Sequence, residues 1–216
     1  ELLDKILDNG HEIAFHTMYH TRLDTPNFRE RFTDEIKRFA VLTKGKSRGF
    51  RAPTFSLNDS SAWLIDVLAN NNYLYDSSVV PAKTNMYGFS DADTKPYKIT
   101  STSLRKNDPN GKILEFPLSV TKILGKRIPV AGGFYLRTLP LKIIKNAIQD
   151  YEKNYIPACF YIHSWELTPE FMPRLKLPVK DHFITYHNLG KTLERMTEII
   201  SNFQFTSFNR FIEGMK

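Results

Sequence analysis

The spacing of hydrophobic residues constrains the fold most, because segments with helical periodicity alternate with short apolar segments typical of strands. Helices are predicted over residues 1–9, 27–43, 58–70, 139–151 and 189–202. Strands are predicted over residues 11–15, 48–51, 73–76, 112–116, 158–162 and 205–208, with an alternating segment at 97–104 and a loop at 132–135. This order is typical of an α/β fold with a largely parallel sheet. Without a linker or repeat in view, we predict a single domain over residues 1–216.

The composition supports a globular chain with one sizeable core. Of its 216 residues, 41% are hydrophobic, which is ample for a core, and no apolar run approaches the ~20 residues that span a bilayer. Cys159 is the single cysteine, so an internal disulfide and a thiolate-rich metal site are excluded. It lies in the apolar segment 158–162, and we predict an inert core residue.

The formal charge of +7 and pI near 9.4 favour polyanionic partners in a general way. No Lys/Arg block alternates with aromatic residues, however, so we predict a dispersed basic surface and no nucleic-acid partner. The chain begins inside an amphipathic helix without an initiating Met, and we expect it to start within a domain. The sequence does not determine the compartment, although we favour a cytoplasmic or membrane-peripheral location over a secreted one. It does not determine the oligomeric state either.

His16 and His20 form the first candidate site. They follow the predicted strand 11–15 and are four residues apart, so a helical turn would place both imidazoles on one face. Imidazole is a common zinc ligand. A pair with this spacing is more often ordinary polar surface, but the end of a buried strand is the usual place for a site in α/β folds.

Other predicted strands also end in polar or aromatic groups. These segments are Arg51–Phe55, Asp76–Ser78, Glu115–Pro117 and His163–Glu166. Because strand ends converge at one mouth of a parallel barrel, we expect these groups to share a pocket. A metal on His16 and His20 would polarise a carbonyl and activate water, and His163 could protonate a leaving amine. The aromatic residues expected to stack on sugar rings are Phe55, Tyr135 and Trp165.

Several motifs of the sequence resemble those of a known family. The motifs Gly-His-Glu-Ile-Ala-x-His-Thr-x-x-His, Arg-x-Pro-x-Phe, Tyr-Asp-Ser-Ser and Ile-His-x-Trp-Glu resemble those of polysaccharide deacetylases with a NodB homology domain (carbohydrate esterase family four). Segments 115–117, 132–140 and 188–193 are similar to a subgroup linked to exopolysaccharide loci. The resemblance covers nearly the whole chain, in the family's own order.

The resemblance implies a distorted, incomplete (β/α) barrel that binds a divalent metal, with zinc as the expected ion, and hydrolyses N-acetyl groups on the hexosamines of a polysaccharide. It implies His16 and His20 as metal ligands, Arg51 as the residue that positions the catalytic base, and His163 as general acid. Trp165 would wall the acetyl pocket. The other residues expected to contact substrate are Pro53, Phe55, Asp76, Gly133 and Tyr135.

One departure from the family is large. Its first motif, a Thr-Phe-Asp-Asp-like strand that supplies the third metal ligand and the base, has no counterpart among the fifteen residues before His16. We therefore expect an N-terminally truncated deacetylase domain that lacks its first strand or strands. Two histidines hold zinc poorly, so we predict weak zinc binding and little activity. Should zinc bind tightly, Asp24 and Asp76 are the first suspects for a third ligand.

Simpler interpretations stay open beside this one. The fold could serve a carbohydrate-binding pseudoenzyme, or a related amidohydrolase acting on peptidoglycan or small amides. His163 could be structural, Arg51 could form a surface salt bridge, Phe55 and Trp165 could fill the core, and Asp76 could form a turn. Glu166 could pair with Arg51 or with Arg137. The remaining histidines, His11, His182 and His187, are predicted not to bind metal.

Overall fold

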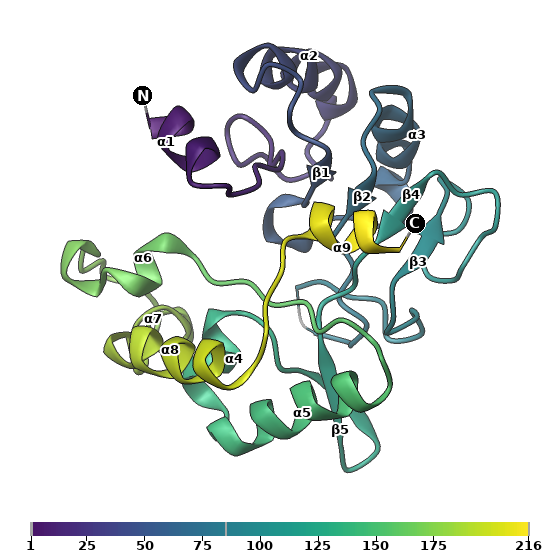
Figure 1. Ribbon diagram of the computed structural model, residues 1–216. Helices are drawn as coiled ribbons and strands as arrows, with labels where there is room; N and C mark the ends of the chain where they lie inside the picture. Colours follow the sequence, from purple (N-terminus) through teal and green to yellow (C-terminus); the bar gives the residue numbers. More distant parts are fainter. Residues whose placement is uncertain (1, 85, 216) are drawn as a thin grey trace. The chain divides into compact units, whose positions relative to one another are not determined.

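The computed structural model describes residues 2–84 and 86–215. The chain divides into two compact units (Figure 1): unit 1 consists of Glu1–Pro117 and Thr206–Lys216, and unit 2 of Leu118–Phe205. The division falls at a junction without linker-type composition. The class is mixed α/β, as the sequence predicts. Among the described residues the strands form one four-stranded and one two-stranded sheet, neither of them closed into a barrel.

Unit 1 is built on the four-stranded sheet. Its strands are β1 (Gly49–Phe50), β2 (Tyr75–Asp76), β3 (Tyr97–Ile99) and β4 (Ile113–Glu115), in the order β1-β2-β4-β3. β2 runs parallel to β1 and β4, whereas β3 is antiparallel to β4. These strands confirm the predicted segments in shortened form.

The predicted strand over residues 11–15 is reduced to a single parallel bridge between Phe15 and Phe50. Phe15 donates its N–H to Gly49 O at 2.8 Å and accepts the N–H of Arg51 at 3.1 Å. Earlier in the segment, the carboxylate of Glu12 accepts a hydrogen bond from the hydroxyl of Tyr75 at 2.5 Å. The sheet therefore has a partial fifth member at its β1 edge.

The helices of unit 1 are α1 (Leu2–Asp8), α2 (Phe28–Leu42), α3 (Trp63–Asn70) and α9 (Phe208–Gly214), with 3₁₀ turns at Pro53–Phe55 and Asp59–Ser61. The predictions for the first three helices are confirmed. The predicted strand over 205–208 is wrong, because Ser207 caps α9 by accepting the N–H of Arg210.

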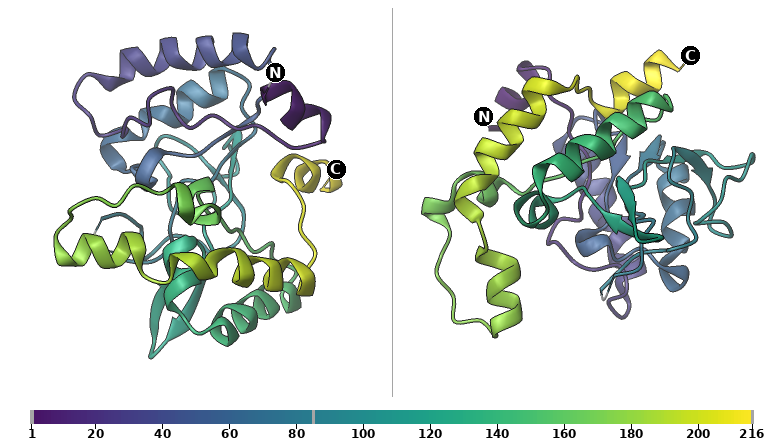
Figure 2. Two further views of the ribbon diagram at one scale, coloured as in Figure 1. Left: turned by 90° about the vertical axis from the view of Figure 1, so that its left-hand side faces the viewer. Right: turned by 90° about the horizontal axis from the view of Figure 1, so that it is seen from below.

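Helices cover both faces of this sheet (Figures 1 and 2). On one face, Phe50 of β1 packs against Phe32 of α2, with ring centroids 5.5 Å apart. Because side chains alternate between faces along a strand, Tyr75 points to the other face, where it meets Phe208 of α9 at 4.9 Å. Gly49 permits this packing, since a Cβ there would lie 1.8 Å from the Tyr75 ring.

Unit 2 contains a hairpin and several helices. Its elements are β5 (Val120–Ile123), β6 (Lys126–Pro129), α4 (Gly133–Thr138), α5 (Leu141–Lys153), α6 (Ser164–Leu167), α7 (Val179–Tyr186) and α8 (Thr192–Asn202), with 3₁₀ turns at Pro169–Phe171 and Leu189–Lys191. The hairpin turn has positive φ at both Leu124 (49°) and Gly125 (77°), as a type I′ turn requires. The segment at 132–135, predicted as a loop, enters helix α4.

The core of unit 2 lies between helices and an extended segment. Ile144 and Ile148 of α5 pack with Leu136 of α4 and Ile199 of α8, and α5 and α8 lie side by side (Figure 2). The strand predicted over 158–162 is wrong as a strand. Its residues extend through the core but join no ladder, and Ser119 binds the Cys159 carbonyl through N–H at 3.2 Å and Oγ at 3.0 Å. Cys159 is buried, as predicted.

Within the described ranges, no helix is both long enough and apolar enough to cross a membrane.

Candidate functional site

The strand ends of unit 1 align in one row across the sheet. Phe15 pairs with Phe50, Phe50 with Asp76, and Asp76 with Glu115. The residues that follow, His16, Arg51, Ser77 and Phe116, form the next row. Because the strands are parallel, their carboxyl ends meet at one edge of the sheet. This edge holds the candidate site of unit 1.

His16 and His20 lie together in the loop that leaves this edge, here called the histidine loop (residues 16–21). Their ring centroids are 5.1 Å apart, with an interplanar angle of 67°. The Nδ1 atom of His16 lies 2.6 Å from the backbone carbonyl of Arg51, which can only accept, so Nδ1 carries the proton and Nε2 keeps a lone pair. Both histidines are exposed.

The loop backbone is strained at two positions. Thr17 and His20 have φ of 57° and 55°, in the left-handed region that non-glycine residues rarely adopt. Such residues persist where their surroundings fix the conformation, and they cluster at functional sites.

Arg51 links the histidine loop to the next strand. Its side chain donates to the carbonyl of Ser77 at 2.9 Å and to Ser77 Oγ at 2.7 Å, and Ser77 Oγ donates to Phe116 O at 2.8 Å. Hydrogen bonds therefore run from His16 through Arg51 and Ser77 to Phe116. Arg51 is thus held by hydrogen bonds to Ser77, whereas the simpler interpretation of Arg51 was a surface salt bridge.

Pro53 and Phe55 form the 3₁₀ turn that follows Arg51. Both are buried, and the Phe55 ring, 6% exposed, packs 5.2 Å from the ring of Tyr87. The Arg51 guanidinium lies 5.9 Å from the Phe55 centroid. Burial gives both residues a packing role at this edge and leaves little of Phe55 open to a substrate.

Asp76 and Glu115 form a buried carboxyl pair on neighbouring strands, each 0% exposed. Asp76 Oδ1 accepts Ser78 Oγ at 2.5 Å, and Glu115 Oε1 accepts the Val79 N–H at 2.9 Å. Burial raises the pKa of Asp76 to about 6, and burial together with the neighbouring Asp76 raises the pKa of Glu115 well above its usual range.

The structure thus places Asp76 in the core. The predicted contact between Asp76 and a substrate stays a prediction, since the structure shows this carboxylate fully buried. Asp24, the other suspect for a third metal ligand, is paired with Arg22, whose Nε and Nη2 donate to its carboxylate at 2.9 and 2.7 Å. Among residues 2–84 and 86–215, no group of three or more His, Cys, Asp or Glu is arranged to hold a metal ion.

A zinc ion implied by the resemblance fits the histidine pair in one respect. Metal-bound imidazoles usually donate their second ring nitrogen to a carbonyl or carboxylate, as His16 Nδ1 does here. Zinc held at this loop would take its imidazole donors from His16 and His20, the two residues that the ring geometry brings together.

Unit 2 holds the second cluster, centred on Glu166. Glu166 Oε2 accepts the backbone N–H of His163 at 2.9 Å and lies 3.1 Å from His163 Nδ1. The indole of Trp165 stacks on the His163 ring, with centroids 5.2 Å apart and planes at 17°. The His163 side chain is 49% exposed, so a carboxylate orients one ring nitrogen while the ring stays open to solvent.

Glu166 also forms a buried ion pair with Arg137, at 3.1 Å with both side chains 1% exposed. This contact settles which of Arg51 and Arg137 pairs with Glu166. Burial raises the pKa of Glu166, but hydrogen bonds from His163 and the charge of Arg137 outweigh burial, so the pKa is lowered. Glu166 was not among the predicted site residues, although its spacing from His163 matches a capping box.

Gly133 and Tyr135 lie in α4. A Cβ on Gly133 would lie 1.9 Å from the Glu166 carboxylate, so glycine allows this carboxylate to approach the helix. Gly133 therefore has a packing role, and its predicted contact with a substrate stays a prediction. Tyr135 is half-buried and packs edge-on against Phe134 at 5.4 Å. The structure thus brings His16, His20 and Arg51 together in unit 1, and Gly133, His163 and Trp165 in unit 2.

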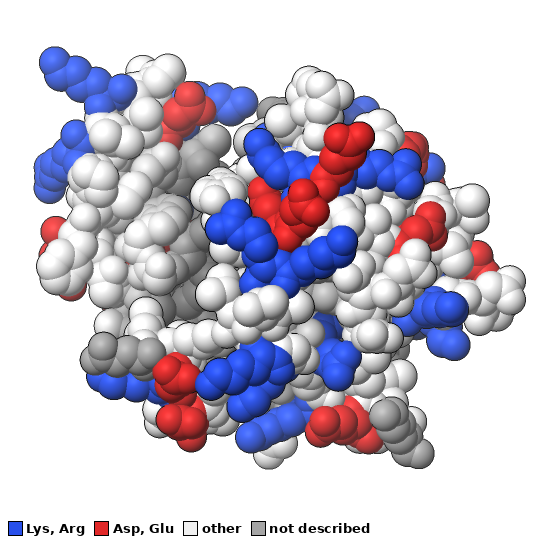
Figure 3. Space-filling model, turned by 90° about the horizontal axis from the view of Figure 1, so that it is seen from above, with Lys and Arg blue, Asp and Glu red and all other residues white. Residues whose placement is uncertain are grey.

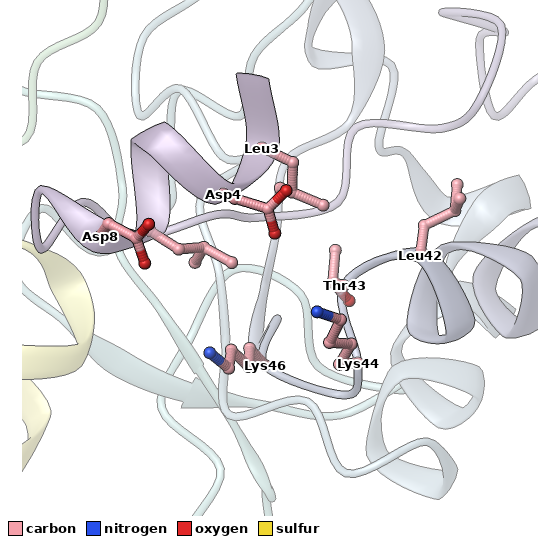
Figure 4. Close-up of a pocket in the computed structure, with 8 residues that line it drawn as sticks. Leu3, Asp4, Asp8, Leu42, Thr43, Lys44 and Lys46 are labelled. Carbon is pink, nitrogen blue, oxygen red and sulfur yellow. The ribbon is translucent and has the colours of Figure 1, made fainter. Parts of the chain in front are cut away.

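A small cavity of about 120 Å³ lies between α1 and the turn after α2 (Figure 4). It is lined by Leu3, Asp4, Leu7, Asp8, Leu42, Thr43, Lys44 and Lys46, none of them a predicted site residue. On the face shown in Figure 3, Lys and Arg side chains are interspersed with Asp and Glu. The charges on that face do not separate into a patch of one sign.

Comparison with known proteins gives one family. Residues 77–213 match the model of a domain of unknown function, DUF3473. The match includes Glu115, Gly133, Tyr135, His163 and Trp165, and begins after His16, His20 and Arg51. No curated protein matches the chain. Because the match spans more than half of its residues, the chain belongs to the DUF3473 family, a domain found in polysaccharide deacetylase-like proteins of exopolysaccharide loci.

Proposed function

We propose that this chain is a deacetylase-type domain for metal-dependent hydrolysis of N-acetyl groups on the hexosamines of a polysaccharide. The observation that carries the proposal is the histidine pair. Two imidazoles face each other at the carboxyl edge of a parallel sheet, and a carbonyl at 2.6 Å fixes the proton of His16 on Nδ1. We infer that this sheet is part of an incomplete (β/α) barrel of the polysaccharide deacetylase type.

His16 and His20 would hold the metal, with zinc as the expected ion. When bound, zinc supplies Lewis-acid polarisation of the acetyl carbonyl and lowers the pKa of a bound water. The hydrogen bond from His16 Nδ1 to Arg51 O keeps the His16 ring in one tautomer and orientation. With this two-histidine donor set we expect weak zinc affinity.

Arg51 is proposed to position the groups at the sheet edge. It is a permanent cation, and its bonds to Ser77 fix its guanidinium beside Phe55. Its backbone carbonyl orients His16. Arg51 would therefore act through its neighbours, whereas the resemblance implies that it positions the catalytic base.

His163 is proposed as the general acid that protonates the leaving amine. Its exposed ring can exchange a proton with a substrate, and Glu166 on Nδ1 leaves Nε2 as the working atom. A buried carboxylate in this position stabilises the imidazolium. Trp165, stacked on His163, provides an aromatic surface for a sugar ring or an acetyl methyl group.

The first test is a zinc titration by calorimetry, with the His16→Ala/His20→Ala double variant as control. We expect weak binding that the double variant abolishes. Acetate release from N-acetylated chito-oligosaccharides and from peptidoglycan fragments is then measured in zinc, with a chelator control. Release from peptidoglycan alone would point to the related amidohydrolase.

Two outcomes would contradict the proposal. Zinc binding that is unchanged in the double variant would refute the ligand assignment. Saturable sugar binding that ignores chelators, with no acetate released even by a chain extended at its N-terminus by the family's first motif, would favour a carbohydrate-binding pseudoenzyme. For such a protein the stack of the exposed His163 on the half-buried Trp165 would suffice.

A further inference from the structure

We propose that Glu35 is a positioning residue for the histidine pair: from α2, its buried carboxylate holds the histidine loop in the conformation that brings His16 and His20 together. This inference rests on the proposed function for its consequence, control of metal affinity. The loop geometry that it explains is a property of the chain itself.

Glu35 is buried on the core-facing side of α2, next to Ile36 and one turn from Phe32, and is only 2% exposed. A carboxylate at such a position is costly unless it is hydrogen-bonded or paired. Its Oε2 accepts the backbone N–H of Met18 at 2.9 Å. Met18 lies midway between His16 and His20, so this bond fixes the centre of the loop.

Arg31, one turn earlier on α2, supplies a second tether. Its Nε lies 3.3 Å from Glu35 Oε1, and its Nη2 donates to Thr21 Oγ1 at 2.9 Å. Within the loop, Thr21 donates its N–H to Thr17 Oγ1 at 2.9 Å. The Glu35–Arg31 pair therefore holds the loop both at its centre and at its end.

The strained backbone explains why tethers are needed. Thr17 and His20 flank Met18, and both have positive φ, a conformation that persists only where the surroundings impose it. A charged acceptor on the N–H of Met18 is a strong bond of this kind. Without it, we expect the loop to relax toward ordinary backbone angles and the two rings to separate.

The test uses the whole chain in four variants. Glu35→Leu removes the hydrogen bond to Met18 N–H and the ion pair with Arg31, whereas Glu35→Gln keeps an acceptor for Met18 N–H. Arg31→Gln removes the second tether at a residue whose side chain is 53% exposed, so this variant serves even if Glu35→Leu does not fold. Glu30→Gln, on the exposed part of the same helix, is the matched control for charge.

Two measurements are made on each variant. Nuclear Overhauser contacts between the His16 and His20 rings, with hydrogen exchange of the Met18 amide, report the loop without any metal. Zinc affinity by calorimetry reports the consequence. For Glu35→Leu we expect loss of the ring contacts, faster exchange at Met18 and zinc binding weaker by about 10- to 100-fold. We expect near-complete rescue in Glu35→Gln, an intermediate loss in Arg31→Gln and no change in Glu30→Gln.

Folding is checked by circular dichroism and thermal unfolding. Ring contacts and Met18 protection that survive in folded Glu35→Leu, or in Arg31→Gln should Glu35→Leu not fold, would overturn the inference. So would an equal loss in Glu30→Gln. If the unchanged chain binds no zinc beyond the double histidine variant, the proposed metal function fails, and the ring contacts alone decide the role of Glu35.

Discussion

The two units each present an exposed histidine, and the partner of the Nδ1 atom differs between them. In unit 1, His16 Nδ1 faces the neutral carbonyl of Arg51 at 2.6 Å. In unit 2, His163 Nδ1 faces the carboxylate of Glu166 at 3.1 Å. A carbonyl fixes a tautomer without adding charge, whereas a carboxylate stabilises the ring when it takes up a proton.

This difference suits the two histidines to the two different roles proposed for them. A neutral imidazole that is protonated on Nδ1 can use its Nε2 lone pair to bind a metal. An imidazole next to a buried carboxylate is suited to holding and delivering a proton. The surroundings agree, since His16 has a second imidazole beside it, whereas His163 has an indole stacked on its face.

The largest expected effect follows from removing the proton carrier. In a chain extended at its N-terminus by the family's first motif, His163→Ala should lower the turnover of acetate release by ~10²–10⁴-fold while zinc stays bound, because the role proposed for His163 is proton transfer and not metal binding. His16→Ala should lose zinc binding and turnover together. Turnover per bound zinc separates the two variants. Turnover that is retained in His163→Ala would contradict the general-acid role of His163 and the contrast drawn between His16 and His163.

The next largest effect concerns the carboxylate of Glu166. Glu166→Leu leaves the guanidinium of Arg137 buried without its counter-charge, a change that typically costs about 3–5 kcal/mol. We expect the lower end, since the carbonyls of Ile184 and His187 still accept from Arg137. Glu166→Gln keeps an acceptor and should cost less. Urea denaturation measures both variants, and equal stability of Glu166→Leu and the unchanged chain would contradict the ion-pair assignment.

The acidic groups of the two units predict opposite pH dependence. Asp76 has a folded pKa of about 6 against an ordinary 3.8, so the stability that it contributes is complete below pH 3.8 and is lost as pH rises through about 6. Glu115 acts in the same direction. Glu166 has a lowered pKa, so its contribution is present above its ordinary pKa of 4.5 and is lost as pH falls through the folded value.

The two tryptophans of the chain make this prediction measurable. Trp63 lies in α3 of unit 1 and Trp165 in α6 of unit 2, so Trp165→Phe and Trp63→Phe each leave one reporter. With Trp63 reporting, raising the pH from 5 to 8 should lower the urea midpoint, and Asp76→Asn should remove part of that slope. The same slope in Asp76→Asn would mean that Asp76 does not titrate in this range.

The sequence predicts the sheet of unit 1 well, because helical and strand periodicities are local signals. The four strand segments and the helices before them lie where the spacing indicates. Strand ends that meet at one edge, including His16, Arg51 and Asp76, follow from parallel topology alone. The carboxylates that orient the site could not be assigned in this way. Glu35 interrupts an apolar helical face, and Glu166 had two possible arginine partners.

Unit 2 is where local signals mislead. The segment 158–162 has the composition of a buried strand, yet it lies against helices, and the Cys159 carbonyl is bound by Ser119 instead of a ladder partner. Two further differences lie outside unit 2. The strand predicted over 205–208 is wrong because Ser207 caps helix α9 of unit 1. The burial of Asp76 in unit 1 could not be predicted either, because Asp-Ser-Ser is also typical of a turn, whereas in the structure Asp76 lies on β2 beside Glu115 of β4.

The smallest expected effect sharpens the ligand assignment in unit 1. Asp24 follows the histidine loop closely enough in sequence to be suspected as a third zinc ligand, but both of its oxygens accept from Arg22, which is itself partly exposed. The Arg22 guanidinium accordingly lowers the pKa of Asp24, and an exposed pair of this kind contributes about 0–1 kcal/mol to stability. Asp24→Asn should therefore have the same zinc affinity as the unchanged chain. Calorimetry measures this affinity, and Arg22→Gln is the matched control. A marked loss of zinc binding in Asp24→Asn but not in Arg22→Gln would mean that Asp24 breaks its ion pair with Arg22 and binds the metal. The donor set would then be two histidines and a carboxylate, which is one of the ligand sets of catalytic zinc sites.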